Sequence, residues 1–256
     1  MGRKYRYHSP EYTLDHIEHI ISTMGIKNFH FEDDNLTLHR RHFRRILNGI
    51  LERDIDIAWD TPNGIRADSL SRDTMKLMKK AGAKVLQIAI ESGNETVLND
   101  IIKKDSKIAP YYDVAKWCYE LDITLGAFYV IGFPGETKQD MEDTTNLALE
   151  LFTLYNVFPI LLFATPLYGT ELYLTAKDLG LIPDDINDDE FATATQFYGE
   201  PLIHTEDFSK DDLKEIAQNF EKDMSIVANK PNALREVLSN KTALLQKDGA
   251  LRAVSI

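Results

Sequence analysis

Gly126-Ala-Phe-Tyr-Val-Ile-Gly-Phe-Pro-Gly-Glu-Thr137 joins a strand, a turn and the start of a helix in one short stretch. Residues 125–131 are apolar and aromatic, which is typical of a strand that helices cover on both faces. Pro134 halts the strand, and a glycine on each side of the turn leaves space for backbone or a ligand to approach. Thr137 followed by Asp140 has the spacing of a helix N-cap with its reciprocal acid. We therefore expect a rigid strand–turn–helix unit.

The same plan recurs along the chain. Short apolar segments predict strands at 27–32, 55–59, 85–90, 125–131 and 156–164, and residues with helical periodicity follow each of them. This alternation predicts an α/β fold with a parallel sheet, which is either an open doubly wound sheet or part of a (βα) barrel. In both architectures ligands bind at the C-terminal ends of the strands.

The character of the sequence changes after Gly180. Residues 183–190 are acidic and predict a linker with little helix, whereas Ser209 with Asp212 opens another amphipathic helix. Pro231 then precedes a last helical segment. We expect two parts, a barrel over residues 1–180 and a linker with a helical C-terminal extension over 181–256.

Composition bounds the partners and the redox chemistry. A formal net charge of −12 makes nucleic acid an unfavourable partner and favours a cytoplasmic protein, and no apolar run has the length of a membrane span. Cys118 is the only cysteine, so this chain alone can form no disulfide and no iron–sulfur site. Its place on an apolar helix face predicts a buried small hydrophobe.

Polar residues gather at the ends of the predicted strands. If these ends cluster, one cleft is lined by Asp33, Asp34, Asp60, Arg66, Glu91 and the turn 132–135. Carboxylates accept hydrogen bonds from ribose hydroxyls or an ammonium group, an arginine pairs with a carboxylate, and the backbone of a glycine turn can meet an adenine edge. The set suits a zwitterionic nucleoside. The alternative for each acid is that it caps a helix and binds water.

His30 raises a second alternative. With Asp33 and Asp34 it could hold a metal ion and serve a metal-dependent barrel hydrolase, which stoichiometric zinc or manganese would support. A single histidine without a spaced partner is more typical of a hydrogen-bonded residue of the barrel.

Four motifs occur in order: Phe31-Glu-Asp-Asp-Asn-Leu36, Gly64-Ile-Arg-Ala-Asp68, Ile90-Glu-Ser-Gly-Asn-Glu95 and Ile131-Gly-Phe-Pro-Gly-Glu-Thr137. Together they resemble the radical S-adenosylmethionine (radical SAM) enzymes, especially the subgroup with an upstream cobalamin-binding domain. The resemblance covers residues 3 to 180. It implies a partial (βα)6 TIM-like barrel, of which the first strand is missing here, and S-adenosylmethionine as cofactor.

The resemblance also implies a role for each motif. Motif 31–36 would contact the methionine amino group, motif 64–68 the methionine carboxylate, motif 90–95 the ribose and motif 131–137 the adenine. No residue is assigned a catalytic role. The implied cofactor-binding residues are Asp33, Asp34, Asn35, Arg66, Glu91, Ser92, Ile131, Gly132, Pro134 and Gly135.

The departure from the family concerns its iron–sulfur cluster. Family members hold a [4Fe–4S] cluster on a CxxxCxxC loop after the first strand, and residues 2–10 look like the segment just downstream of that loop. We therefore expect the C-terminal part of a longer enzyme, inactive by itself and prone to self-association through its exposed barrel edge. The parent would cleave S-adenosylmethionine to a 5′-deoxyadenosyl radical or, with cobalamin from the upstream domain, transfer methyl groups to a small molecule or another substrate.

A non-catalytic scaffold or binding domain that keeps the fold without the cluster is the remaining alternative. Cysteines encoded immediately upstream of Met1 would exclude it.

Overall fold

The strand–turn–helix unit is present in the computed structural model, which describes residues 6–183, 186–195 and 199–230. β4 (Thr124–Ile131) leads into the turn, and α5 (Lys138–Tyr155) begins after its N-cap Thr137. The Thr137 hydroxyl accepts a hydrogen bond from the Asp140 N–H, and the Asp140 carboxylate accepts one from the Thr137 N–H. This capping box, as predicted, satisfies donors that the helix itself leaves unpaired.

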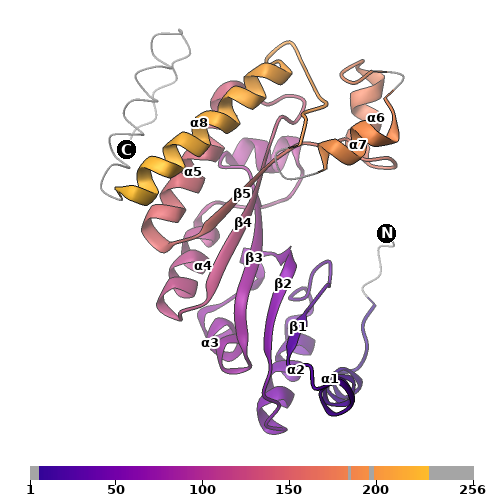
Figure 1. Ribbon diagram of the computed structural model, residues 1–256, viewed down its shortest axis with the longest axis vertical. Coiled ribbons are helices and arrows are strands. Elements are labelled where there is room, and N and C mark those ends of the chain that lie inside the picture. The colour runs from indigo at the N-terminus through magenta and orange to yellow at the C-terminus, as the bar shows by residue number, and fades with distance from the viewer. Residues whose placement is uncertain (1–5, 184–185, 196–198, 231–256) are drawn as a thin grey trace. The chain divides into compact units, whose positions relative to one another are not determined.

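Five strands form one sheet in the order β1-β2-β3-β4-β5 (Figure 1). The other four strands are β1 (Asn28–His30), β2 (Ala58–Ile65), β3 (Ala83–Glu91) and β5 (Phe158–Phe163). β1 pairs with β2 and β2 pairs with β3 in parallel register. The predicted α/β fold with a parallel sheet is therefore confirmed.

Helices lie before, between and after the strands, and each of the first four strands is followed by a helix as the periodicity predicts. They are α1 (Pro10–Met24), α2 (Arg40–Glu52), α3 (Arg72–Lys80), α4 (Ala109–Glu120), α6 (Glu171–Asp178), α7 (Asp188–Ala194) and α8 (Lys210–Asn229). A 3-10 turn covers Ala67–Ser69 and a π-helical turn covers Val97–Ile101. Within the described ranges no helix combines the length and the apolar character that a bilayer span requires.

The position predicted for the second strand was wrong. Residues 55–59 were expected to form it, but the strand runs from Ala58 to Ile65. The polar residues after Trp59 stay extended, and the pairing with β3 is irregular between Thr61 and Ile65, where Pro62 lacks an N–H and Gly64 has a φ of 85°.

The acidic linker was also expected to contain little helix. Instead α7 starts at Asp188, because the Asn187 side chain accepts hydrogen bonds from two backbone N–H groups and the Glu190 carboxylate accepts one from the Asn187 N–H. The helical segment predicted after Pro231 lies outside the described residues.

The chain forms two compact units, and two of the three points at which it passes from one to the other fall inside β3 and β4. The first unit contains the chain up to Ala89 with Pro110–Ala127, and the second contains Ile90–Ala109 with the chain from Phe128 onward. The division predicted at residue 180 stays a prediction.

The core of the first unit is centred on Trp59. Its ring makes edge-on contacts with Phe31 and Phe43, and its indole Nε1 donates a hydrogen bond to the Ala81 carbonyl at 2.8 Å. Cys118 is buried on α4, as predicted.

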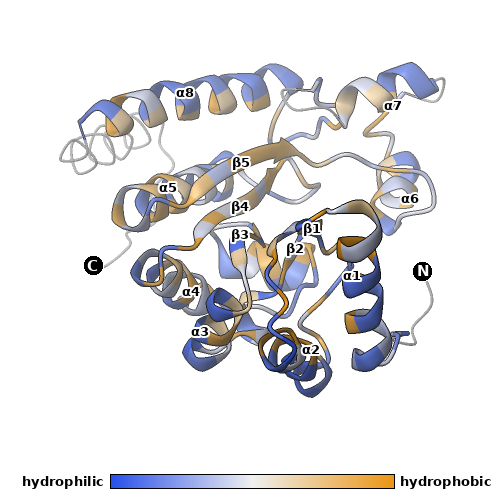
Figure 2. Ribbon diagram, turned by 60° about the horizontal axis from the view of Figure 1, so that its bottom comes forward, coloured by the Kyte–Doolittle hydropathy of each residue, from blue (hydrophilic) through white to orange (hydrophobic). Residues whose placement is uncertain are grey.

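The core of the second unit joins β4 and α5 to the chain after residue 180. Figure 2 shows the hydrophobic colouring of β4 and β5, and Ile131 and Met141 belong to one buried cluster with Phe191, Ile203 and Leu213. α8 lies alongside α5 and contributes Leu213 to that cluster (Figure 1). The helices after residue 180 therefore complete the second unit's core.

Candidate functional site

Glu91 ends β3 in an unusual backbone conformation. Its φ is 69°, a left-handed value that costs a non-glycine residue about 1–2 kcal/mol. Such residues persist where the surrounding structure fixes them, and they cluster at binding sites. The Glu91 side chain is 24% exposed, and its Oε1 lies 3.2 Å from Lys104 Nζ. Among the described residues, none donates a hydrogen bond to Oε2, so this oxygen can accept one from a ligand.

Ser92, the neighbouring candidate, faces the interior. It is fully buried, and its Oγ lies 3.1 Å from Thr144 Oγ1 and accepts a hydrogen bond from the Asn94 N–H. At Gly93 a Cβ atom would lie 2.4 Å from the Asp143 carbonyl oxygen, so only glycine allows this approach to α5. These contacts fix the loop after Glu91, and the ribose contact assigned to Ser92 stays a prediction.

The turn after β4 is held by Glu136, which the sequence reasoning left without a role. This residue is fully buried, and its Oε2 accepts hydrogen bonds from the N–H groups of Gly132 and Phe133, both at 2.7 Å. Its Oε1 is buried without a partner among the described residues. Burial raises the pKa of Glu136 to about 7, although the two N–H bonds act in the opposite direction. The signal in the sequence that could have pointed to this role is an acid directly after Gly135 in a mostly apolar motif.

The other predicted residues of this turn differ in exposure. Ile131 is buried, and its carbonyl accepts a hydrogen bond from the Ala164 N–H at 2.8 Å. Gly132 has a φ of 93°, and a Cβ there would lie 3.0 Å from a methyl group of Leu213. Pro134 is half-buried, and Gly135, with a φ of 95°, is exposed.

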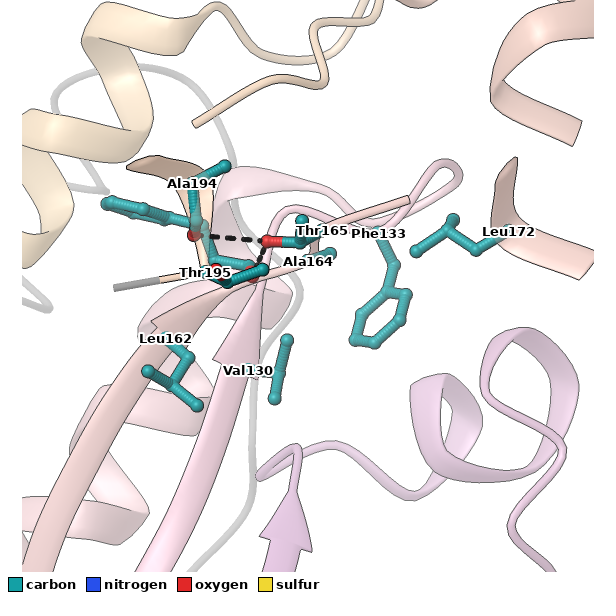
Figure 3. Close-up of a pocket in the computed structure, with 9 residues that line it drawn as sticks. Val130, Phe133, Leu162, Ala164, Thr165, Leu172, Ala194 and Thr195 are labelled. Atoms are coloured by element: carbon teal, nitrogen blue, oxygen red, sulfur yellow. Dashed lines mark hydrogen bonds between the residues drawn. The ribbon is translucent and has the colours of Figure 1, made fainter. Parts of the chain in front are cut away.

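A cavity of about 290 Å³ lies at the C-terminal ends of β4 and β5 (Figure 3). The residues that line it are mostly apolar: Val130, Phe133, Leu162, Phe163, Ala164, Thr165, Leu172, Ala194 and Thr195. The Thr165 hydroxyl lies within hydrogen-bonding distance of two backbone carbonyls, at 3.1 and 3.3 Å, and the Thr195 hydroxyl donates to the Ala192 carbonyl. Because both hydroxyls are engaged with backbone, the cavity suits a flat, uncharged ring.

The remaining predicted residues belong to the first unit. Asp33 and Asp34 are exposed and Asn35 is half-buried in the turn after β1. Desolvation raises the pKa of Asp33, and the charge of Asp34 adds to the shift. Arg66 makes a bidentate ion pair with Asp68, with Nε to Oδ1 at 3.0 Å and Nη2 to Oδ2 at 2.6 Å. Its contact with a methionine carboxylate stays a prediction.

His30 pairs with Asp60 rather than with the acids after β1. Its Nδ1 lies 2.5 Å from Asp60 Oδ1, and this hydrogen bond raises the pKa of His30. The interpretation of His30 as a hydrogen-bonded residue is therefore confirmed. Across the described ranges, no three His, Cys, Asp or Glu side chains gather as a metal site.

Comparison with known proteins gives related chains of greater length. A cytidylyl-2-hydroxyethylphosphonate methyltransferase of Streptomyces wedmorensis is 26% identical over 232 residues, which are 88% of this chain and 41% of that protein. Coproporphyrinogen III oxidase of Escherichia coli, a radical SAM enzyme, superposes with a TM-score of 0.56 at 13% identity, covering 84% of this chain and 46% of that one.

The radical SAM methyltransferase TsrM of Kitasatospora setae, solved with cobalamin and a [4Fe–4S] cluster, has a TM-score of 0.54 at 16% identity. The superposition covers 64% of this chain and 32% of the TsrM chain. These likenesses support the partial TIM-like barrel, and the chain spans less than half the length of each of the three proteins. The sequence profile of the Radical SAM superfamily matches residues 1–148, more than half of the sequence. The chain therefore belongs to the radical SAM superfamily.

Proposed function

We propose that this chain binds S-adenosylmethionine at the C-terminal ends of its strands, as part of a radical SAM methyltransferase. The observation that carries the proposal is Glu91, a half-buried carboxylate held in a left-handed backbone at the end of β3, inside the region that matches the family. The similarity to a methyltransferase over 88% of the chain supports methyl transfer as the reaction of the whole protein.

The second unit would hold the nucleoside. Glu91 Oε2 accepts a hydrogen bond from a ribose hydroxyl, while Oε1 stays paired with Lys104. The apolar cavity beside Val130 and Phe133 takes the adenine ring, because it is large enough for one fused ring and presents mostly carbon. The turn 132–135 closes one side of this site and is kept rigid by Glu136.

The residues of motifs 31–36 and 64–68 would bind the amino acid part, as the motif resemblance implies. The carboxylates of Asp33 and Asp34 and the amide of Asn35 receive the methionine ammonium group. Arg66 binds the methionine carboxylate in addition to Asp68, since a guanidinium carries five N–H donors and can serve two carboxylates.

The family's cofactors define the reaction class. A bound [4Fe–4S] cluster supplies the electron for reductive cleavage of S-adenosylmethionine. Its thiolate ligands would come from outside these 256 residues, whose one cysteine, Cys118, is buried. Cobalamin on another domain of the whole protein is the second proposed cofactor, following the motif resemblance.

Titration of the chain with S-adenosylmethionine tests the assignment of Glu91. Glu91→Gln removes a charge-assisted hydrogen bond, so we expect the dissociation constant to rise about ten- to a hundredfold, corresponding to about 1.5–3 kcal/mol. The protein should stay folded, because the amide keeps the shape of the side chain and its oxygen can still accept from Lys104. Glu215→Gln, an exposed acid on α8, is the matched control and should bind like the wild type. An unchanged affinity with a lowered melting temperature would make Glu91 a purely structural residue.

A further inference from the structure

Lys104 is held by a segment of unusual backbone geometry. The residues on both sides of it have left-handed backbones, with a φ of 59° at Lys103 and 50° at Asp105. Its side chain is only 13% exposed, and its Nζ reaches Glu91 Oε1 at 3.2 Å. Left-handed residues other than glycine are uncommon, and two that flank a half-buried lysine indicate a segment built to place that side chain.

Hydrogen bonds fix this segment from both ends. The Lys104 N–H donates to the Leu98 carbonyl at 2.8 Å, which ties it to the π-helical turn just before it; the turn itself closes with the bond from the Ile102 N–H to the Val97 carbonyl. Asn99 bridges the segment: its Nδ2 donates to the carbonyls of Glu95 and Ser106, and its Oδ1 accepts from the Ser106 N–H at 2.9 Å. Interrupted helical turns of this kind are frequent at functional sites.

The neighbouring lysine provides a contrast within the same segment. Lys103 Nζ pairs with Glu171 Oε1 on α6, and both side chains are well exposed, at 64% and 76%. An exposed pair of this kind contributes little because water competes for both charges. Lys104 and Glu91 are shielded from water, so their ion pair can orient the carboxylate.

We propose that Lys104 is a positioning residue that orients the Glu91 carboxylate toward the ribose of the bound nucleoside. By engaging Oε1, the ammonium group fixes the rotation of the carboxylate and presents Oε2 to the ribose hydroxyls. When the ligand covers the Glu91 carboxylate and removes its water, the ammonium group of Lys104 also compensates the negative charge. This inference rests on the proposed function, since it requires a nucleoside at Glu91.

Two probes separate positioning from direct contact with the amino acid. S-adenosylmethionine carries the nucleoside and the methionine group, whereas 5′-methylthioadenosine carries the same nucleoside without the amino acid. We expect Lys104→Ala to raise the dissociation constants of both probes by a similar factor, about tenfold. Lys104→Arg should recover most of the affinity, because it keeps the charge next to Oε1.

A double-mutant cycle tests the coupling to Glu91. In the Glu91→Gln background, Lys104→Ala should weaken binding of 5′-methylthioadenosine by less than twofold, because the carboxylate it orients is already gone. Lys103→Ala is the matched control and should leave both affinities unchanged. Melting temperatures of all variants, including Lys104→Met, which keeps most of the side-chain bulk, show whether each protein is folded.

Distinct results would overturn the inference. If Lys104→Ala weakens S-adenosylmethionine alone, Lys104 contacts the amino acid part directly. If its effect adds fully to that of Glu91→Gln, or if only the melting temperature falls, the residue does not act through Glu91. If the wild-type chain binds neither probe, the proposed function itself fails, and the inference fails with it.

Discussion

Glu136 is a fully buried carboxyl group at one end of the turn after β4. One of its oxygens accepts both N–H bonds of the turn, and the other meets no partner among the described residues. Ionisation is therefore opposed by burial, and the pKa rises from its usual 4.5 to about 7. In the folded state the group binds its proton more tightly than in the unfolded chain. Its contribution to stability is thus complete below pH 4.5 and is lost as the pH rises to about 7.

Glu136→Gln should remove this pH dependence. The amide oxygen can still accept from Gly132 and Phe133, but the side chain no longer ionises. We expect the stability of the wild type relative to the variant to fall by roughly 3 kcal/mol between about pH 4.5 and about pH 7. Urea denaturation at the two pH values measures it, with Glu215→Gln as control. Wild-type and variant stabilities that change in parallel with pH would contradict the proposed ionisation.

Cys118 should be inert in the folded protein. It is 1% exposed on α4, and burial raises the pKa of its thiol to about 12, so the reactive thiolate is absent at neutral pH. A thiol reagent should modify the chain only after unfolding, and iron with sulfide should give no [4Fe–4S] absorption. Rapid labelling of the native chain would show that α4 opens.

At the scale of elements, local signals predicted helix starts better than strand limits. Thr137 and Ser209 each cap a helix by accepting a bond from the N–H of the third residue after them, a contact that depends on a few neighbouring positions only. The extent of β2 depends instead on pairing with β3, which residues 60–65 alone do not reveal.

Long-range and side-chain partners explain the rest of what was missed. The residues of the predicted site lie at or just after the C-terminal ends of strands. The alternation of strands and helices in the sequence had already implied that this end of the sheet carries the site. The pairing of Arg66 with Asp68 and the inward turn of Ser92 toward Thr144 depend on side-chain directions that motif order does not encode. The cavity could not be anticipated, because it joins β4 and β5 to residues 194 and 195.

α8 provides a prediction about one element. Its capping box uses Ser209 and Asp212, and its Leu213 packs in the core of the second unit. Ser209→Ala should lower the free energy of unfolding by about 1 kcal/mol, because the Asp212 N–H loses its acceptor. Ser225→Ala, an exposed change in the same helix, should have almost no effect. Equal losses for the two variants in urea denaturation would mean that the cap contributes nothing.

At the scale of the whole molecule, we expect the two edge strands of the sheet to determine whether copies of the chain associate. β1 and β5 stand last in the strand order, so within the described residues each pairs with one neighbour only. β5 is the more apolar of the two, and Phe158 at its start is 66% exposed. Open strand edges of this kind pair readily with other chains.

The chain should therefore self-associate as its concentration rises. Phe158→Lys places a charge at the β5 edge and should shift sedimentation toward the monomer, whereas Ile226→Lys on α8, also exposed, should not. A wild-type chain that sediments as a stable monomer at high concentration would refute this expectation.

The two units are interleaved along the chain, which passes from one to the other at residues 89/90, 109/110 and 127/128. Domain borders usually fall in exposed linkers, but the first and last of these crossings lie within β3 and β4. Neither unit can consequently be transplanted as a cassette by one recombination event, because any single break divides at least one of them.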